Sequence, residues 1–252
     1  MSRVPVESTT DLKTCSTATI AGAPESDIGK ALVLIRRHFI SALSSVGTAG
    51  LLGSAALAAP GASAQEPTGP ILIMGDSLSA EYGLRRGEGW VALLERRLAD
   101  EKIRQRIVNA SISGETSAGG RSRLDALLRQ HKPSTVVIEL GANDALRGLP
   151  VAQTEANLLT MVKASQGAGA KVLLVGIQVP PNYGTDYLNR FAQVFENVGT
   201  AAKVPVVPFL LRGVADGPDA ASMFQADRIH PVAAAQPRML DNVWPALRKL
   251  IG

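Results

Sequence analysis

The sequence is very poor in cysteine, with only Cys15 among 252 residues. Because Cys15 precedes a predicted cleavage site, the mature chain would carry no thiol. This excludes disulfides, thiol catalysis and cysteine-based metal sites. Histidine is also scarce, with three residues, and no His-x-x-x-His or His-Glu pair is present to bind zinc. The glycine-rich patterns of nucleotide-binding loops are absent too. We therefore expect no metal and no cofactor.

Charge of one sign is not in large excess, and aromatic residues are few. The chain has 26 Lys and Arg against 22 Asp and Glu, and only 4% of its residues are aromatic. Basic pairs such as Arg85-Arg86 and Arg96-Arg97 have little aromatic interleaving, so they fit a solvated helix face better than a nucleic-acid surface. With 46% hydrophobic residues, the chain can bury the core of one enzyme-sized domain.

The N-terminal part resembles an export signal. A basic pair, Arg36-Arg37, precedes an apolar stretch, Ile40–Ala59, and Ala62-Ser63-Ala64 forms a small-residue cleavage site. We expect a signal peptide over residues 35–64, removed after Ala64, and a periplasmic or secreted protein. The Arg-Arg-x-Phe-Ile string is compatible with a twin-arginine signal and with an ordinary secretory signal.

The remaining segments are a polar N-terminal extension and one domain. Residues 1–34 are expected to be a disordered extension or the product of a misplaced start, and residues 65–252 to form the folded domain. No further apolar run is long enough to suggest a membrane span, so we expect no stable membrane insertion after cleavage. The sequence carries no signal for an oligomeric state.

Short apolar runs alternate with amphipathic stretches along the domain. This pattern predicts an α/β fold: a three-layer sandwich with a parallel sheet of about five strands and helices on both faces. The expected strands are Ile71–Met74, Arg106–Ala110, Thr135–Leu140, Lys171–Ile177 and Val204–Val207. The expected helices are Trp90–Glu101, Arg121–His131, Gln153–Gln166, Leu188–Ala202 and one within Val232–Leu250, delayed by Pro237.

Three strings carry chemically useful residues. Gly75-Asp76-Ser77-Leu78-Ser79 and Gly141-Ala142-Asn143-Asp144 each follow an expected strand, and Asp227-Arg228-Ile229-His230-Pro231 lies near the C-terminus. Together they supply a serine, an amide donor, an acid and a base, the groups needed for acyl transfer through a serine ester.

The histidine of this set follows almost by elimination. His38 lies in the leader, and His131 ends an amphipathic helix before Pro133, where a basic side chain favours the helix dipole. His230 remains, with Asp227 three residues earlier. The simpler interpretations are a polar loop for Asp227–His230 and a turn or helix cap for Ser77. Ser79 breaks the Gly-x-Ser-x-Gly elbow of the α/β-hydrolases, so that superfamily is disfavoured.

The chain resembles the SGNH (GDSL) hydrolases between Pro70 and Leu250. That family is named after four blocks carrying Ser, Gly, Asn and His, and all four are present in order. The second block is Asn109–Ser117, with Gly114 at the motif glycine. Within the family, the chain is most similar to the exported thioesterase I/lysophospholipase/arylesterase group. Ala142 is a departure, since that group often has glycine there, and we expect little effect from it.

The resemblance implies a flavodoxin-like SGNH fold and a role for each matching residue. Ser77 would be the nucleophile, His230 the general base and then acid, and Asp227 the residue that orients His230. The backbone N–H groups of Ser77 and Gly114 and the side-chain amide of Asn143 would form the oxyanion hole. Asp76 and Asp144 are weaker candidates for the acid, because each has an alternative use in turn hydrogen bonds.

Two loops are expected to overhang the serine and bind the substrate. They contain Leu146-Arg147-Gly148 and Pro180-Pro181-Asn182-Tyr183-Gly184, and Leu146, Pro181 and Tyr183 offer apolar contact. The expected function is hydrolysis of acyl thioesters, arylesters or lysophospholipids, with a small acyl ester or lipid as substrate. The alternatives are a carbohydrate O-acetylesterase on the same fold and a non-catalytic binding module.

Overall fold

A computed structural model describes residues 69–179 and 183–252. The centre of the fold is a five-stranded sheet, all of whose strands are parallel, in the order β2-β1-β3-β4-β5. The prediction of a parallel α/β sandwich is therefore confirmed. The predicted extension, signal peptide and cleavage site lie outside the described residues.

The strands are short and almost entirely apolar. They are β1 (Ile71–Gly75), β2 (Ile107–Asn109), β3 (Thr135–Glu139), β4 (Lys171–Val175) and β5 (Val206–Val207). Every residue of β1 and β3 is buried, as expected for strands covered on both faces. Their register pairs Ile71 with Thr135 and Gly75 with Glu139, so the two strands end side by side.

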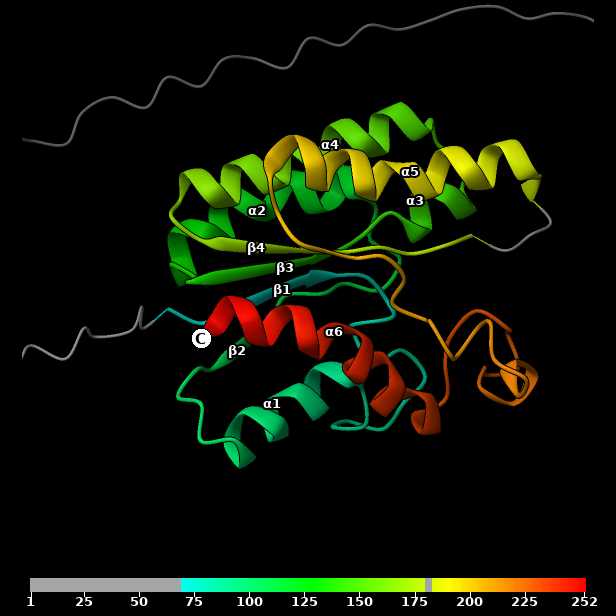
Figure 1. Cartoon of the computed structure of the whole chain (residues 1–252), viewed down its shortest axis with the longest axis horizontal. Helices are drawn as coiled ribbons and strands as arrows, with labels where there is room; N and C mark the ends of the chain where they lie inside the picture. Colours follow the sequence, from blue (N-terminus) through cyan, green and yellow to red (C-terminus); the bar gives the residue numbers. More distant parts are fainter. Residues whose placement is uncertain (1–68, 180–182) are drawn as a thin grey trace, which may run out of the picture. The chain divides into compact units, whose positions relative to one another are not determined.

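Two helical layers enclose the sheet (Figure 1). Helices α1 and α6 cover one face, and α2, α4 and α5 cover the other, with α3 beside them. Their bounds are α1 Trp90–Asp100, α2 Ser117–His131, α3 Ala142–Leu146, α4 Val151–Gly167, α5 Thr185–Ala202 and α6 Gln236–Ile251, with short 3-10 turns η2 Ala220–Ser222 and η3 Ala233–Ala235.

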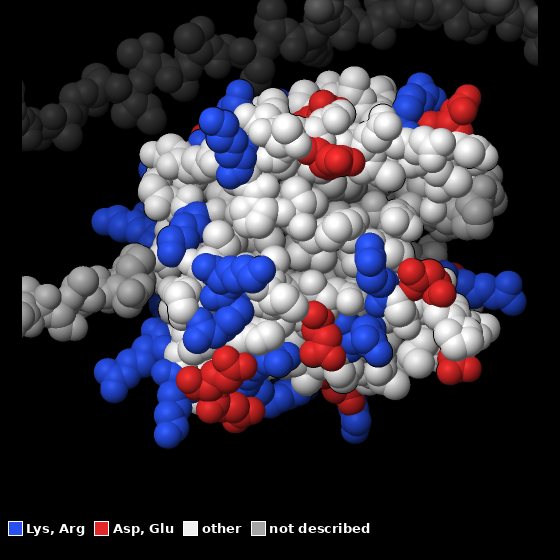
Figure 2. All heavy atoms as spheres, in the orientation of Figure 1, with Lys and Arg blue, Asp and Glu red and all other residues white. Residues whose placement is uncertain are grey.

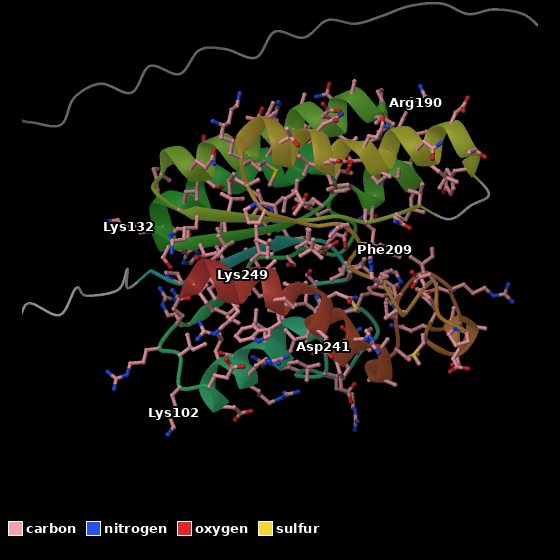
Figure 3. The ribbon with its side chains drawn as sticks, in the orientation of Figure 1. Lys102, Lys132, Arg190, Phe209, Asp241 and Lys249 are labelled. Carbon is pink, nitrogen blue, oxygen red and sulfur yellow. The ribbon has the colours of Figure 1, made fainter. Side chains whose placement is uncertain are left out.

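The core consists of the strand side chains and one apolar stripe from each long helix. Trp90 of α1 and Phe191 and Phe195 of α5 are among its largest members, with the Phe191 and Phe195 rings packed edge to face at 5.7 Å between centroids. Phe209, which follows β5, is also buried (Figure 3). The apolar faces that the sequence pattern predicted therefore meet in one core.

Two elements differ from the expected ones, and the last helix agrees. α2 begins at Ser117, capped by the Thr116 side chain, which accepts from the Gly119 N–H at 3.3 Å. α3 was not predicted, because its five residues are too few to show a helical period. The last helix begins late, as expected, with Pro237 in its first turn, where proline loses no helical hydrogen bond.

The surface carries charges of both signs. On the face shown in Figure 2, Lys and Arg side chains lie over α1 and α6 and are interspersed with Asp and Glu. Arg97 illustrates the mixing, because it contacts Glu101 at 3.3 Å and Asp241 at 3.2 Å. Among the described helices, none is both long and apolar enough to cross a bilayer.

The strand order places a reversal point between β1 and β3. The chain moves from β1 to β2 on one side and then returns to add β3, β4 and β5 on the other. In sheets of this kind the crevice for ligands lies beyond the carboxyl ends of the strands at that point. Ser77 follows β1 by two residues, and Asn143 follows β3 by four, so both lie at the reversal point.

Candidate active site

Three predicted site residues form a continuous chain of hydrogen bonds. The Ser77 Oγ lies 2.9 Å from Nε2 of His230, and Nδ1 of His230 lies 2.6 Å from Oδ2 of Asp227. Ser77 comes from the turn after β1, whereas the other two come from the segment before α6. The structure thus joins residues about 150 positions apart. With Nδ1–H directed at a carboxylate, Nε2 is free to accept the serine proton.

The turn around Asp227 holds its carboxylate in the ionised form. Oδ1 of Asp227 accepts the backbone N–H groups of Ile229 at 2.9 Å and His230 at 3.0 Å. These bonds, led by that from the His230 backbone, lower the pKa of Asp227 to about 2. Arg228 takes a left-handed conformation, with φ 58°, which closes the turn. The two carboxylate oxygens of Asp227 thereby reach His230, Oδ1 at its backbone N–H and Oδ2 at Nδ1.

The amide of Asn143 points at the serine turn. Its Nδ2 donates to Oδ2 of Asp76 at 3.1 Å, and Oδ1 of Asp76 accepts the Leu78 N–H at 3.0 Å. Asp76 is fully buried, and burial raises its pKa to about 6. One amide hydrogen of Asn143 is therefore occupied by Asp76, and the second remains available for a ligand.

Two backbone N–H groups accompany that amide. Gly114 has φ 79°, a conformation that glycine adopts at little cost, and the Arg147 guanidinium donates to its carbonyl at 2.9 Å. Neither the Ser77 nor the Gly114 N–H donates to another described residue. Both N–H groups therefore remain available to a ligand beside Ser77, where the segments that contain Gly114 and Asn143 approach it.

Asp144, the other rival acid, serves a different purpose. Its buried carboxylate accepts the Ser117 N–H at 2.8 Å, the Ser117 hydroxyl, and the Thr154 hydroxyl at 3.2 Å. Asn157 extends the network by donating to Ser117 Oγ at 2.9 Å. Asp144 thus joins the first turns of α2 and α4 to α3. The histidine hydrogen-bonds Asp227, and not Asp76 or Asp144.

A second buried carboxyl lies beneath the serine turn. Glu139, the last residue of β3, accepts the Ser79 hydroxyl at 2.7 Å, and Trp90 Nε1 donates to Ser79 Oγ at 3.2 Å. Burial, and next the charge of Asp76, raise the pKa of Glu139 well above its ordinary value. A Cβ on Gly75 would meet both Ser79 and Glu139, so this close approach requires glycine.

The remaining sequence candidates lie around the edges of the site. His131 ends α2, next to the start of β3 and so at the opposite edge of the sheet. Ala142 is the first residue of α3, where its helical backbone suits alanine as well as glycine. Leu146 is 38% exposed at the end of α3. Tyr183 packs against Tyr187, with centroids 6.1 Å apart, and Pro181 lies outside the described residues.

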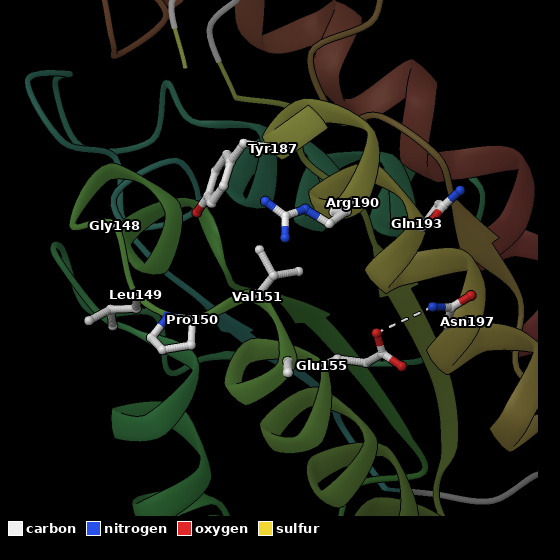
Figure 4. A pocket seen from close by; sticks show the side chains of 10 residues that line it. Gly148, Leu149, Pro150, Val151, Glu155, Tyr187, Arg190, Gln193 and Asn197 are labelled. Carbon is white, nitrogen blue, oxygen red and sulfur yellow. Dashed lines mark hydrogen bonds between the residues drawn. The ribbon is translucent and has the colours of Figure 1, made fainter. Parts of the chain in front are cut away.

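A shallow groove lies between the start of α4 and the outer side of α5 (Figure 4). Leu149, Pro150 and Val151 form one wall, and Tyr187 and Arg190 belong to the other. It begins at Gly148, directly after the end of α3, where Leu146 and Arg147 lie. The groove is close in sequence to the Asn143 block, but it does not include Ser77 or His230.

Sequence reasoning missed three residues of the site: Glu139, Tyr82 and Gln225. The Tyr82 ring packs against His230, with centroids 4.2 Å apart, and the Gln225 N–H donates to the His230 carbonyl at 2.8 Å. Glu139 had the clearest signal, since a carboxyl residue inside an apolar strand is unusual. Tyr82 and Gln225 belong to irregular loops that contact each other across 143 positions, and no pattern in one sequence reports such a contact. Among the described residues, no group of three His, Cys, Asp or Glu could hold a metal ion.

Comparison with known proteins gives consistent results. The model of the GDSL-like lipase/acylhydrolase family matches residues 73–236. The esterase TesA of Pseudomonas aeruginosa is 55% identical over 181 residues, which cover 72% of this chain and 89% of that protein. The thioesterase 1/protease 1/lysophospholipase L1 of Escherichia coli K12 is 40% identical, covering 72% of this chain and 84% of that protein.

A solved relative is also similar over the whole described domain. It is the esterase EstA from Pseudoalteromonas sp., in a structure inhibited by monoethylphosphonate. It is 43% identical, covers 72% of this chain and 97% of its own, and superimposes with a TM-score of 0.68.

Proposed function

This chain belongs to the GDSL-like lipase/acylhydrolase family and is a hydrolase acting on ester bonds, and we propose that it is an exported serine esterase. In this proposal Ser77, His230 and Asp227 act as a triad through an acyl-enzyme. The observation that carries it is the unbroken chain of hydrogen bonds from Ser77 Oγ through His230 to Asp227.

The acylation step follows from that arrangement. The Ser77 oxygen attacks the ester carbonyl carbon while its proton moves to Nε2 of His230. The carbonyl oxygen becomes an oxyanion, which accepts the N–H groups of Ser77 and Gly114 and the free amide hydrogen of Asn143. When the carbon–oxygen or carbon–sulfur bond breaks, His230 returns the proton to the leaving alcohol or thiol. Water then hydrolyses the acyl-enzyme by the same route.

The surface around the site supports an apolar acyl substrate. Four large hydrophobic side chains remain exposed among the described residues: Tyr82, Ile112, Leu146 and Ile229. Each lies in, or within a few residues of, a different one of the four blocks that carry the proposed site. An acyl chain gains roughly 0.8 kcal/mol per CH₂ group that it buries, so such a rim favours medium or long chains over acetyl.

The triad is tested by covalent labelling. The purified protein should react with a fluorophosphonate, and peptide mapping should locate the label on Ser77. Ser77→Ala should fold with an unchanged circular dichroism spectrum and lose both labelling and ester hydrolysis. A label on Ser79, Ser111 or Ser113 would overturn the assignment, and unlabelled protein that still binds esters would favour the non-catalytic module.

The substrate class is tested with p-nitrophenyl esters and acyl thioesters of increasing chain length. We expect kcat/KM to rise with chain length and Leu146→Ser to flatten the rise. The ratio of kcat/KM between long and short esters is an internal control, because a loss of folded protein lowers the rates with all esters equally. A maximum at acetyl, with acetylated polysaccharide as the better substrate, would replace the lipid-acyl proposal by the carbohydrate esterase.

A further inference from the structure

An aromatic ring covers one face of the proposed catalytic base. The ring centroids of Tyr82 and His230 are 4.2 Å apart, and the ring planes are inclined by 36°. Tyr82 is 50% exposed, and its hydroxyl makes no hydrogen bond to a described residue. The ring face, not the hydroxyl, therefore makes the interaction with the imidazole.

The loop after the serine turn is built to hold this ring in place. Glu81 takes a left-handed conformation, with φ 59°, and its carboxylate accepts the N–H groups of Gly87 at 3.0 Å and Gly89 at 2.8 Å. The Tyr82 N–H donates to the Ser77 carbonyl at 3.4 Å. These bonds fix the backbone from which the Tyr82 side chain extends to the histidine.

Gln225 connects the same loop to the histidine turn. Its side-chain amide donates to the Tyr82 carbonyl at 2.9 Å and to the Pro231 carbonyl at 3.2 Å. Its backbone N–H donates to the His230 carbonyl at 2.8 Å. Gly83 has φ 70°, and a Cβ there would collide with the Gln225 side chain. One residue thus links the backbone of Tyr82 to the backbone of His230 and Pro231.

We propose that Tyr82 is a positioning residue for His230, which keeps Nε2 directed at Ser77 and stabilises the imidazolium that forms during turnover. The face of an aromatic ring carries partial negative charge and attracts a cation at this distance. The interaction strengthens when the imidazole takes the serine proton, so it acts on the transition state more than on the ground state. This inference rests on the proposed Ser77–His230–Asp227 triad.

Two carboxylates also act on the imidazole charge. Asp227 binds Nδ1 directly. Burial raises the pKa of the Asp76 carboxyl, and the charge of His230 acts against that rise, so Asp76 and His230 also interact electrostatically. Arg228 belongs to the same turn, and Ser77 faces Nε2. Substituting Tyr82 leaves all four groups in place, so a change in the pH dependence of turnover reports on the ring.

The test compares Tyr82→Leu with Tyr82→Phe in the full chain, using a soluble p-nitrophenyl ester. Leucine still covers the imidazole but lacks the π face. We expect Tyr82→Leu to lower kcat by about 5- to 30-fold, with less effect on KM, and to move the acid limb of kcat/KM to lower pH. Tyr82→Phe should retain most of the activity and the wild-type limb. Ser77→Ala and His230→Ala are measured in parallel as references.

Gln225→Ala supplies a second measurement. If Gln225 acts through Tyr82, the double variant should lose less kcat than independent effects predict. Its fold-loss should be smaller than the product of the fold-losses of Gln225→Ala and Tyr82→Leu. Fully independent effects would remove Gln225 from the proposal.

Several results would overturn the role of Tyr82. A rise in KM alone would mean that the ring only binds substrate. Equal losses in the Leu and Phe variants would assign the effect to the hydroxyl. A lower kcat with an unmoved acid limb and fewer titratable active sites would indicate a folding defect. If Ser77→Ala or His230→Ala retains hydrolysis, the triad itself fails, whatever Tyr82 does.

Discussion

At the residue scale, the side chain of Asn143 has two tasks that its two amide hydrogens divide. One hydrogen is bound by Asp76, and in the proposed mechanism the other binds the oxyanion. We expect Asn143→Ala to lower kcat by about 10²- to 10³-fold with little change in KM, because the lost bond forms mainly in the transition state. Steady-state kinetics on one soluble ester will measure both constants. A change confined to KM would mean that Asn143 only binds the substrate.

The buried carboxyl of Asp76 makes stability depend on pH. Its pKa is raised from 3.8 to about 6, so the folded protein binds a proton more tightly than the unfolded chain. Stability from this group is then present below pH 3.8 and is lost as pH rises to about 6. The loss is about 3 kcal/mol, since one pKa unit corresponds to about 1.4 kcal/mol.

Asp76→Asn removes this titration. The unfolding free energy of the variant minus that of the wild type should rise by about 2 kcal/mol between pH 4 and pH 7, because at pH 4 the wild type has already lost part of the full effect. The altered hydrogen bonds add an offset that is the same at both pH values. The change with pH therefore reports the linked titration of Asp76 and Glu139, since the Asp76 charge also raises the pKa of Glu139. Denaturant unfolding at several pH values will measure it. A difference that stays constant with pH would show that Asp76 has an ordinary pKa.

At the scale of elements, Asp144 joins three helices through one carboxylate. We expect Asp144→Ala to lower the free energy of unfolding by about 2–4 kcal/mol, because it leaves the Ser117 N–H and two hydroxyls buried without an acceptor. Asp125→Ala, at an exposed position of α2, is the matched control and should change stability by less than about 0.5 kcal/mol. Equal effects of the two substitutions would contradict this role.

The predicted and observed elements agree where the sequence pattern is long and apolar. The runs that became β1, β3 and β4 were recognisable because strands buried on both faces have no polar alternation. α3 was missed because its helix is set by the Asp144 contacts rather than by its own five residues. The first turn of α2 was missed because Gly119 and Gly120 weaken the helical signal, although Thr116 is a typical cap.

The site was predictable to the extent that its residues follow strand ends. Ser77 and Asn143 could be placed together because parallel strands end at one edge of the sheet. The packing of Tyr82 on His230 could not be predicted, because it depends on a left-handed residue at position 81 and on the contact between two loops. Such contacts form only after the sheet has brought the loops together.

At the scale of the whole molecule, we propose that residues 35–64 direct export and are then removed from the domain. We expect the exported protein to begin at Gln65 or an adjacent residue, because Ala62-Ser63-Ala64 is a small-residue cleavage site. Mass spectrometry of periplasmic or extracellular protein will identify the N-terminus. Arg36-Arg37→Lys-Lys should block export only if the twin-arginine route is used. An intact Met1 on cytosolic protein would refute export.

The hydrogen bond from Trp90 through Ser79 to Glu139 gives the protein an internal optical probe. Only two tryptophans are present, and the second, Trp244, lies under the Arg97 guanidinium at 4.9 Å, on the outer layer of helices. We therefore expect the indole emission of Trp90 to change with the ionisation of Glu139, to which Ser79 connects it. Trp90 fluorescence measured across a pH range would then follow a protonation that enzyme kinetics register only indirectly.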